Sequence, residues 1–137
     1  MSMTFATPQE AEDAYYDAID EGDIETMMTV WDESDDVLCL LPMMPAQRGR
    51  HAIRTAWEAI LLGGSPPEIQ INHLSWIETG DFAVHLVEEL FEVSEEPTPQ
   101  RIYATNIYRK DTAGWHLLMH QNSPTPPPPG LRMPEMG

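Results

Sequence analysis

The stretch from Arg101 to Ser123, RIYATNIYRKDTAGWHLLMHQNS, constrains the fold more than any other part of the chain. Ile102 to Arg109 is rich in β-branched and aromatic residues, and Trp115 to Gln121 is apolar again. Asp111 to Gly114, between them, has the composition of a turn. Two such runs separated by a few residues that include glycine predict a β-hairpin. We therefore expect the upstream segments to cover one face of a sheet that this hairpin completes.

Three segments in the first half of the chain show the periodicity of amphipathic helices. Thr7 is a suitable N-cap, Pro8 suits the first helical position, and Gly22 is a suitable end for the first helix. Asp23 is a suitable cap for a second helix. A third helix is predicted from Arg50 to Leu62, because its apolar residues recur at spacings of three and four.

The predicted strands begin with a short apolar run, Val37 to Leu41, and a loop follows from Met43 to Gly49. From Glu68 to Glu78 the period is two, with His73 and Ile77 in the same alternating set. A long strand follows from Phe82 to Val93, with apolar residues on both faces. Three helices followed by four long antiparallel strands predict an α+β fold. A strongly curved sheet facing the helices would leave a cone with an open mouth.

A chain of 137 residues is expected to form one domain, which we place at residues 1–124. Residues 124–137 contain six prolines, so 125–137 is predicted to be an extended, proline-rich tail. The net charge of −16, from 23 acidic and 7 basic residues, disfavours binding to nucleic acid and to anionic membranes.

The single cysteine, Cys39, allows no internal disulfide and lies in an apolar run. We expect a buried structural thiol and a reducing compartment. No basic segment precedes an apolar stretch at the start of the sequence, and no apolar run approaches the roughly 18 residues of a membrane span. The sequence therefore predicts a cytoplasmic protein.

Four segments resemble the nuclear transport factor 2-like (NTF2-like) superfamily, and its SnoaL-like branch in particular: AYYDAIDEGDIETMMTVW (14–31), VLCLLP (37–42), GRHAIRTAWEAI (49–60) and ATNIYRKDTAGWHLLMHQNSP (104–124). The resemblance covers about residues 7–124. It implies a cystatin-like α+β cone, with a strongly curved antiparallel sheet covered on its concave face by three N-terminal helices. It also implies a homodimer through the outer face of the sheet. Members include steroid isomerases, polyketide cyclases, dehydratases, kinase association domains and binding modules.

The resemblance to the ketosteroid isomerases of this superfamily can be followed residue by residue. Their chemistry uses a carboxylate base, with a tyrosine and a protonated aspartic acid that hold the enolate oxygen. The matching positions are Leu41 for the base, Tyr15 for the tyrosine and Asn106 for the aspartic acid. Leucine cannot transfer a proton, whereas an asparagine amide can still donate a hydrogen bond. This inference requires that Leu41 faces the hollow and that no other carboxylate replaces the base.

The candidate ligand-binding residues are Tyr15, Leu41, Met43, Trp57, Asn106 and His120. The alternatives are core packing for the apolar and aromatic residues, and a satisfied buried amide for Asn106. Glu88 and Glu89 are adjacent and face opposite ways, so one of them could be an inward base, and His85 is a weaker candidate than His120. His73 and His116 are less favoured still. No H-x-H, H-x-x-x-H or Cys–His spacing is present, so we predict no metal site and no cofactor.

Three functions fit these patterns. The first is a module that binds a small hydrophobic molecule without ketosteroid isomerase chemistry. The second is a lyase or isomerase that acts on a small hydrophobic carbonyl compound, with His120 or an inward glutamate as acid or base. The third is a dimerisation unit whose cone is filled. A cavity of roughly 300 Å³ or more would favour the first two.

Overall fold

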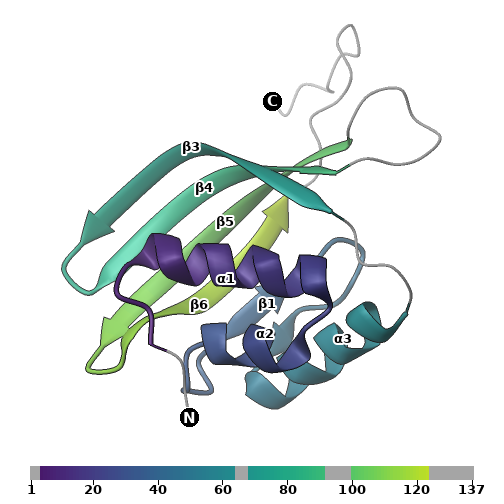
Figure 1. The fold of residues 1–137 in the computed structure, drawn as a ribbon, viewed down its shortest axis with the longest axis horizontal. Coiled ribbons are helices and arrows are strands. Elements are labelled where there is room, and N and C mark those ends of the chain that lie inside the picture. Colours follow the sequence, from purple (N-terminus) through teal and green to yellow (C-terminus); the bar gives the residue numbers. More distant parts are fainter. Residues whose placement is uncertain (1–3, 64–67, 92–99, 124–137) are drawn as a thin grey trace, which may run out of the picture.

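A computed structural model describes residues 4–63, 68–91 and 100–123 (Figure 1). The predicted tail at 125–137, the loop at 94–99 and the breaker residues 64–67 lie outside the described residues. Among the helices of the described part, none has both the length and the apolar character that crossing a membrane requires.

Three helices form where the sequence predicts them: α1 (Pro8–Glu21), α2 (Ile24–Val30) and α3 (Arg50–Leu62). The Thr7 side chain accepts a hydrogen bond from the Glu10 amide, and Gly22 ends α1 in the left-handed conformation with φ 66°. The Asp23 carboxylate accepts from the Thr26 amide and caps α2. In Figure 1 the helices lie together on one side of the sheet.

The sheet has six strands in the order β2-β1-β6-β5-β4-β3. Their bounds are β1 (Leu38–Leu40), β2 (Gln47–Arg48), β3 (Ile69–Thr79), β4 (Phe82–Phe91), β5 (Gln100–Asp111) and β6 (Gly114–Ser123). The predicted hairpin is confirmed, because β5 and β6 pair in antiparallel register around Asp111 and Gly114. The α+β class with a curved sheet is confirmed as well.

Two features of the sheet correct the expectation. The sequence predicts a loop over residues 43–49, but Gln47 and Arg48 form β2 and pair with β1. The sheet is mixed and not wholly antiparallel, because β1 runs parallel to β6. A two-residue strand shows no periodicity, and strand direction depends on how the connecting helices return the chain, so neither feature is visible in local sequence.

The helices bury a core against the concave face of the sheet, and its largest fully buried apolar side chains are Tyr15, Met27, Trp31, Ile53, Tyr108 and Leu117. Cys39 belongs to this core, so the predicted burial of the thiol is confirmed, and burial raises its pKa to about 12. On β4 the side chains alternate: His85 and Glu89 face the core, whereas Phe82 and Val84 face solvent on the other side. The concave face therefore carries polar groups within an apolar interior.

Candidate functional site

A cavity of about 340 Å³ lies between the helices and the sheet. Its wall is mainly apolar, and its lining residues are Tyr15, Ile19, Leu41, Pro42, Met44, Trp57, Ile60, Ile69, Glu89, Phe91, Ile102, His120 and Asn122. The cone is therefore not filled by its own side chains. This volume is in the range of small-molecule sites, which are typically apolar with a few polar groups.

The polar end of the cavity is formed by Glu89, His120 and Asn122. Glu89 is buried, and its two carboxylate oxygens accept hydrogen bonds from different donors. Oε2 accepts from the Tyr16 hydroxyl at 2.7 Å, and Oε1 accepts from Asn122 Nδ2 at 2.9 Å. These two donors fix the orientation of the carboxylate on the cavity wall.

His120 lies beside this carboxylate, with Nε2 at 3.8 Å from Glu89 Oε2. Burial lowers the pKa of His120, although the charge of Glu89 and a hydrogen bond with Asn122 oppose this effect. Nδ1 contacts Asn106 Oδ1, and Nε2 contacts Asn122 Oδ1 at 2.9 Å. Both ring nitrogens of His120 contact asparagine side chains. Glu89 is therefore better placed than His120 to accept a proton from a molecule bound in the cavity.

Of the six predicted ligand-binding residues, Tyr15, Leu41, Trp57 and His120 line this cavity. Met43 does not: it adopts a positive φ of 61° in the turn after β1, and its side chain is fully exposed. The adjacent Met44 lines the cavity in its place. Leu41 faces the hollow as expected, but the hollow also contains a carboxylate, that of Glu89, which reaches it from β4.

Asn106 is completely buried and lies behind His120 instead of on the cavity wall. The resemblance to ketosteroid isomerases places Tyr15 with Asn106 around one oxygen, but Asn106 Nδ2 donates to the hydroxyl of Tyr16 at 3.2 Å. The ring of Tyr15 packs edge-on against Tyr16 and Trp57. Burial and the charge of Glu89 raise the pKa of Tyr16 well above its usual value, so it stays a hydrogen-bond donor.

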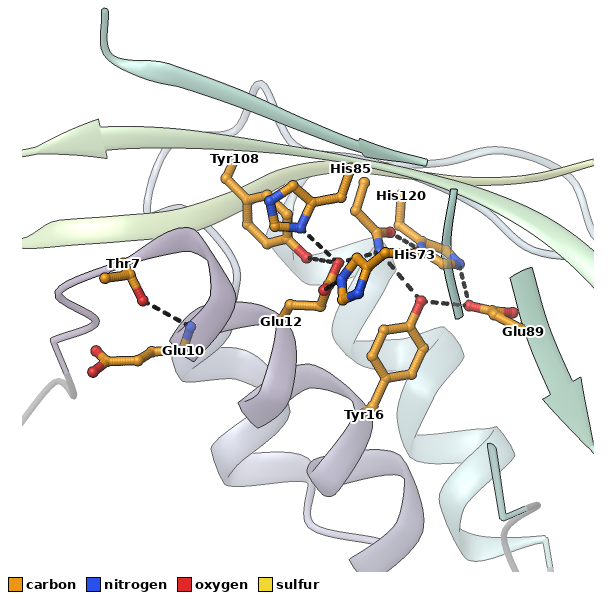
Figure 2. A network of polar contacts seen from close by, with 10 residues as sticks. Thr7, Glu10, Glu12, Tyr16, His73, His85, Glu89, Tyr108 and His120 are labelled. Atoms are coloured by element: carbon orange, nitrogen blue, oxygen red, sulfur yellow. Dashed lines mark hydrogen bonds and ion pairs between the residues drawn. The ribbon is translucent and has the colours of Figure 1, made fainter. Parts of the chain in front are cut away.

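A second polar cluster, which the sequence reasoning missed, surrounds Glu12 of α1 (Figure 2). His73 Nε2 contacts Oε1 of this carboxylate, and His85 Nδ1 contacts Oε2 at 2.9 Å. Oε2 also accepts from the Tyr108 hydroxyl at 3.1 Å and from Asn106 Nδ2 at 3.4 Å. Asn106 therefore connects this cluster to the cavity.

A sequence signal for Glu12 was available. Glu12 and Tyr16 are four residues apart, so they share one face of the first helix. His85 and Glu89 are likewise four residues apart on one strand, so they share the same side of the sheet. Two matched sets of polar residues on facing elements are the pattern of a buried polar network.

The curved sheet beneath three helices is the fold of solved structures that are described as NTF2-like or as having a cystatin-like fold. A family model for the SnoaL-like domain matches residues 9–127, and the chain belongs to that family. The predicted resemblance is therefore confirmed. The comparison with curated proteins gives no match.

Solved structures with the same fold have diverse names. One is a candidate calcium/calmodulin-dependent protein kinase type II association domain from Thiobacillus denitrificans, with 31% identity, coverage of 90% of this chain and 98% of that one, and a TM-score of 0.83. An NTF2-like candidate dehydratase from Streptomyces avermitilis has 24% identity, 88% and 95% coverage, and a TM-score of 0.77. A ketosteroid isomerase-like protein from Erwinia carotovora atroseptica has 17% identity, 87% and 94% coverage, and a TM-score of 0.65. The last two show the fold alone.

Proposed function

We propose that this SnoaL-like protein binds a small, mainly apolar molecule in the cavity, and that a hydroxyl group of this molecule donates to Glu89. The observation that carries the proposal is a cavity of about 340 Å³ with an apolar wall and a single polar end. The Asn122 amide group already donates to Glu89 and to the Tyr103 carbonyl oxygen. The polar end therefore offers acceptor oxygens more readily than donors, which favours a ligand that brings its own hydrogen.

A pair of probes, 2-naphthol and naphthalene, tests this proposal because they differ only in the hydroxyl group. Quenching of tryptophan fluorescence measures binding, since Trp57 lines the cavity. We expect the wild type to bind 2-naphthol about 10-fold more tightly than naphthalene, because a hydrogen bond to a charged group stabilises by roughly 1.5–3 kcal/mol. Glu89→Gln should reduce this preference, because an amide is a weaker acceptor than a carboxylate.

Two tryptophan substitutions give a matched control. Leu41→Trp fills the cavity and should abolish binding of both probes. Met43→Trp places the same side chain two residues away, outside the cavity, and should leave binding unchanged. Equal binding by both variants, or no binding of either probe to the wild type, would reject the proposed pocket.

A second candidate function is proton transfer on a small hydrophobic carbonyl compound, as in a lyase or isomerase. The orientation of Glu89 favours it, because a carboxylate on the wall of an apolar cavity can remove a proton from carbon next to a carbonyl group. His120 would act as a positioning residue for Glu89. Leu41 excludes ketosteroid isomerase chemistry only if no other carboxylate replaces the base at its position. Because Glu89 reaches the same cavity, Leu41 alone does not exclude that chemistry.

Deuterium exchange into 2-cyclohexenone, followed by NMR in D₂O, separates catalysis from binding alone. If Glu89 is a base, the wild type exchanges the protons next to the carbonyl faster than Glu89→Gln does. The same slow rate in both proteins, with 2-naphthol binding intact, would leave a binding module without this activity.

We also propose that the protein is a homodimer through the outer face of the sheet. Ile77, Phe82, Val84 and Leu86 are exposed apolar residues of β3 and β4, and register places them on the face opposite the core. A cytoplasmic location remains a prediction that rests on the sequence.

A further inference from the structure

We propose that Glu12, His73 and His85 bind a divalent transition-metal ion, with Zn²⁺ as the ion to test. The three residues come from three elements: α1, β3 and β4. One ligand atom from each lies within 4.8 Å of the others. One glutamate and two histidines form a ligand set that zinc sites with an open coordination position use.

The charge of Glu12 supports a cation at this place. Its side chain is only 1% exposed, and its two ion pairs in the described part of the chain are both with histidines. Asp13, the next residue, adds a second carboxylate nearby. A bound dication would add to the compensation that the histidine contacts give the buried carboxylate.

The surroundings of Glu12 resemble the outer layer of a metal site. The Tyr108 hydroxyl donates to Oε2 at 3.1 Å, and Asn106 Nδ2 lies 3.4 Å from the same oxygen. Such outer contacts hold a ligand side chain in the orientation that the metal needs. His85 is almost completely buried and is packed against the ring of Tyr108, so its ring is fixed as well.

His73 gives the cluster an opening to solvent. Its side chain is 30% exposed, on the edge strand β3, whereas the other two ligand side chains are 1% exposed. An ion can therefore enter from this side, and a water molecule or a small anion can complete its coordination there. The network in Figure 2 shows His73 and His85 approaching the Glu12 carboxylate from the sheet.

A second group with suitable side chains, Asp32, Asp111 and His116, provides a contrast. Asp32 already has a cation, because Arg109 Nη2 lies 2.7 Å from its Oδ2. Oδ1 of Asp32 and Nδ1 of His116 are buried without a hydrogen-bond partner among the described residues, but the guanidinium supplies a positive charge at Oδ2 of Asp32. We therefore assign metal binding to the Glu12 cluster and use the Asp32 cluster as an internal control.

Zinc titration of EDTA-treated, full-length protein against a chromophoric chelator tests the assignment. We expect one Zn²⁺ per chain in the wild type. His73→Ala and His85→Ala should each weaken binding by at least 10-fold, and Tyr108→Phe by about 10-fold, which is the range for loss of an outer contact. Asp111→Asn, in the contrasting cluster, should bind like the wild type.

Thermal unfolding gives an independent readout. Free Zn²⁺ at 100 times the Kd should raise the Tm of the wild type by roughly 10 °C, and the shift should be lost in His73→Ala. His73 is on an exposed edge, so this variant keeps the test valid if His85→Ala does not fold. No zinc bound by the wild type at about 100 µM free ion, or equal binding by His73→Ala, would overturn the proposal.

Discussion

Glu12 makes the stability of the protein depend on pH. Burial alone would raise the pKa of Glu12, but hydrogen bonds and charge interactions with His85 and then His73 outweigh burial and lower it. A carboxyl group with a lowered pKa in the folded state adds stability above its unfolded pKa, and loses it as the pH falls through the folded value. We expect the metal-free protein to lose stability progressively below about pH 4.5.

Urea unfolding of the wild type and Glu12→Gln, in EDTA and at several pH values, measures this contribution. At neutral pH the variant should be less stable by about 2 kcal/mol, because hydrogen bonds to a charged group are lost. The difference should shrink in acid, where Glu12 of the wild type is protonated. Glu21→Gln, at the exposed end of α1, should show no such trend. A difference that grows in acid would contradict this account.

The sequence predicted which segments form the candidate site, but it did not predict which side chains contact one another there. Tyr15 and Tyr16 are adjacent on a helix, and helical periodicity alone does not decide which hydroxyl reaches Asn106. Met43 follows a proline in a turn, where a positive φ turns the side chain outward. Glu12 escaped notice because a charged residue near a helix start is normally solvated. Its spacing from Tyr16 indicates a shared helix face, but the position of the sheet is needed to show that this face is buried.

At the scale of elements, caps and turns were predictable because their signals are local. Thr7, Asp23 and the Asp111–Gly114 turn act as their residue types predict. The face of β3 was not predictable. Strict alternation places His73 and Ile77 on one face, but the register shifts between His73 and Ser75. His73 therefore pairs with the inward Val87, and Ile77 pairs with the outward Val84.

Gly114, at the start of β6, allows the backbone of the N-terminal segment to pair with this strand. It has φ 100°, and a Cβ atom there would lie 2.5 Å from the carbonyl oxygen of Phe5. The Trp115 amide donates to that same oxygen at 2.8 Å. We expect Gly114→Ala to lower the free energy of unfolding by roughly 3 kcal/mol, because backbone strain and a backbone clash add.

Gly80, in the preceding hairpin turn, is the matched control. It also has a positive φ, 58°, but a Cβ atom at this position would meet no atom within 4 Å. Gly80→Ala should therefore lower the free energy of unfolding only through the strain of a positive φ, by about 1 kcal/mol. Chemical denaturation of both variants measures the difference. Equal losses would show that the contact with Phe5 does not restrict position 114.

For the whole molecule, polar side chains run through the interior from one site to the other. Glu12, Asn106, His120 and Glu89 are linked by hydrogen bonds and close contacts that connect the proposed metal site to the polar end of the cavity. Asn106 holds the central position because its amide donates on one side and accepts on the other. The two proposed sites therefore bind different ligands but are connected by one network of polar side chains.

In contrast to this polar interior, the outer face of the sheet carries exposed apolar side chains. These side chains are the reason that we expect a homodimer. Val84 lies between Ile77 of β3 and Ile107 of β5 in the sheet register. A cluster of exposed apolar side chains of this kind favours a partner surface, and a second copy supplies an identical one. Each chain carries a net charge of −16, so salt should strengthen the dimer by screening repulsion.

Sedimentation velocity at about 100 µM protein tests this assembly, since a standard interface holds at such concentrations. We expect a wild-type dimer, a shift toward dimer as salt increases, and a monomer for Val84→Arg, because a charge would be buried at the centre of the interface. Leu62→Arg introduces the same charge at an exposed apolar residue of α3, in the helical layer, and should remain dimeric. A monomeric wild type would reject the dimer, and dissociation by both variants would place the interface elsewhere.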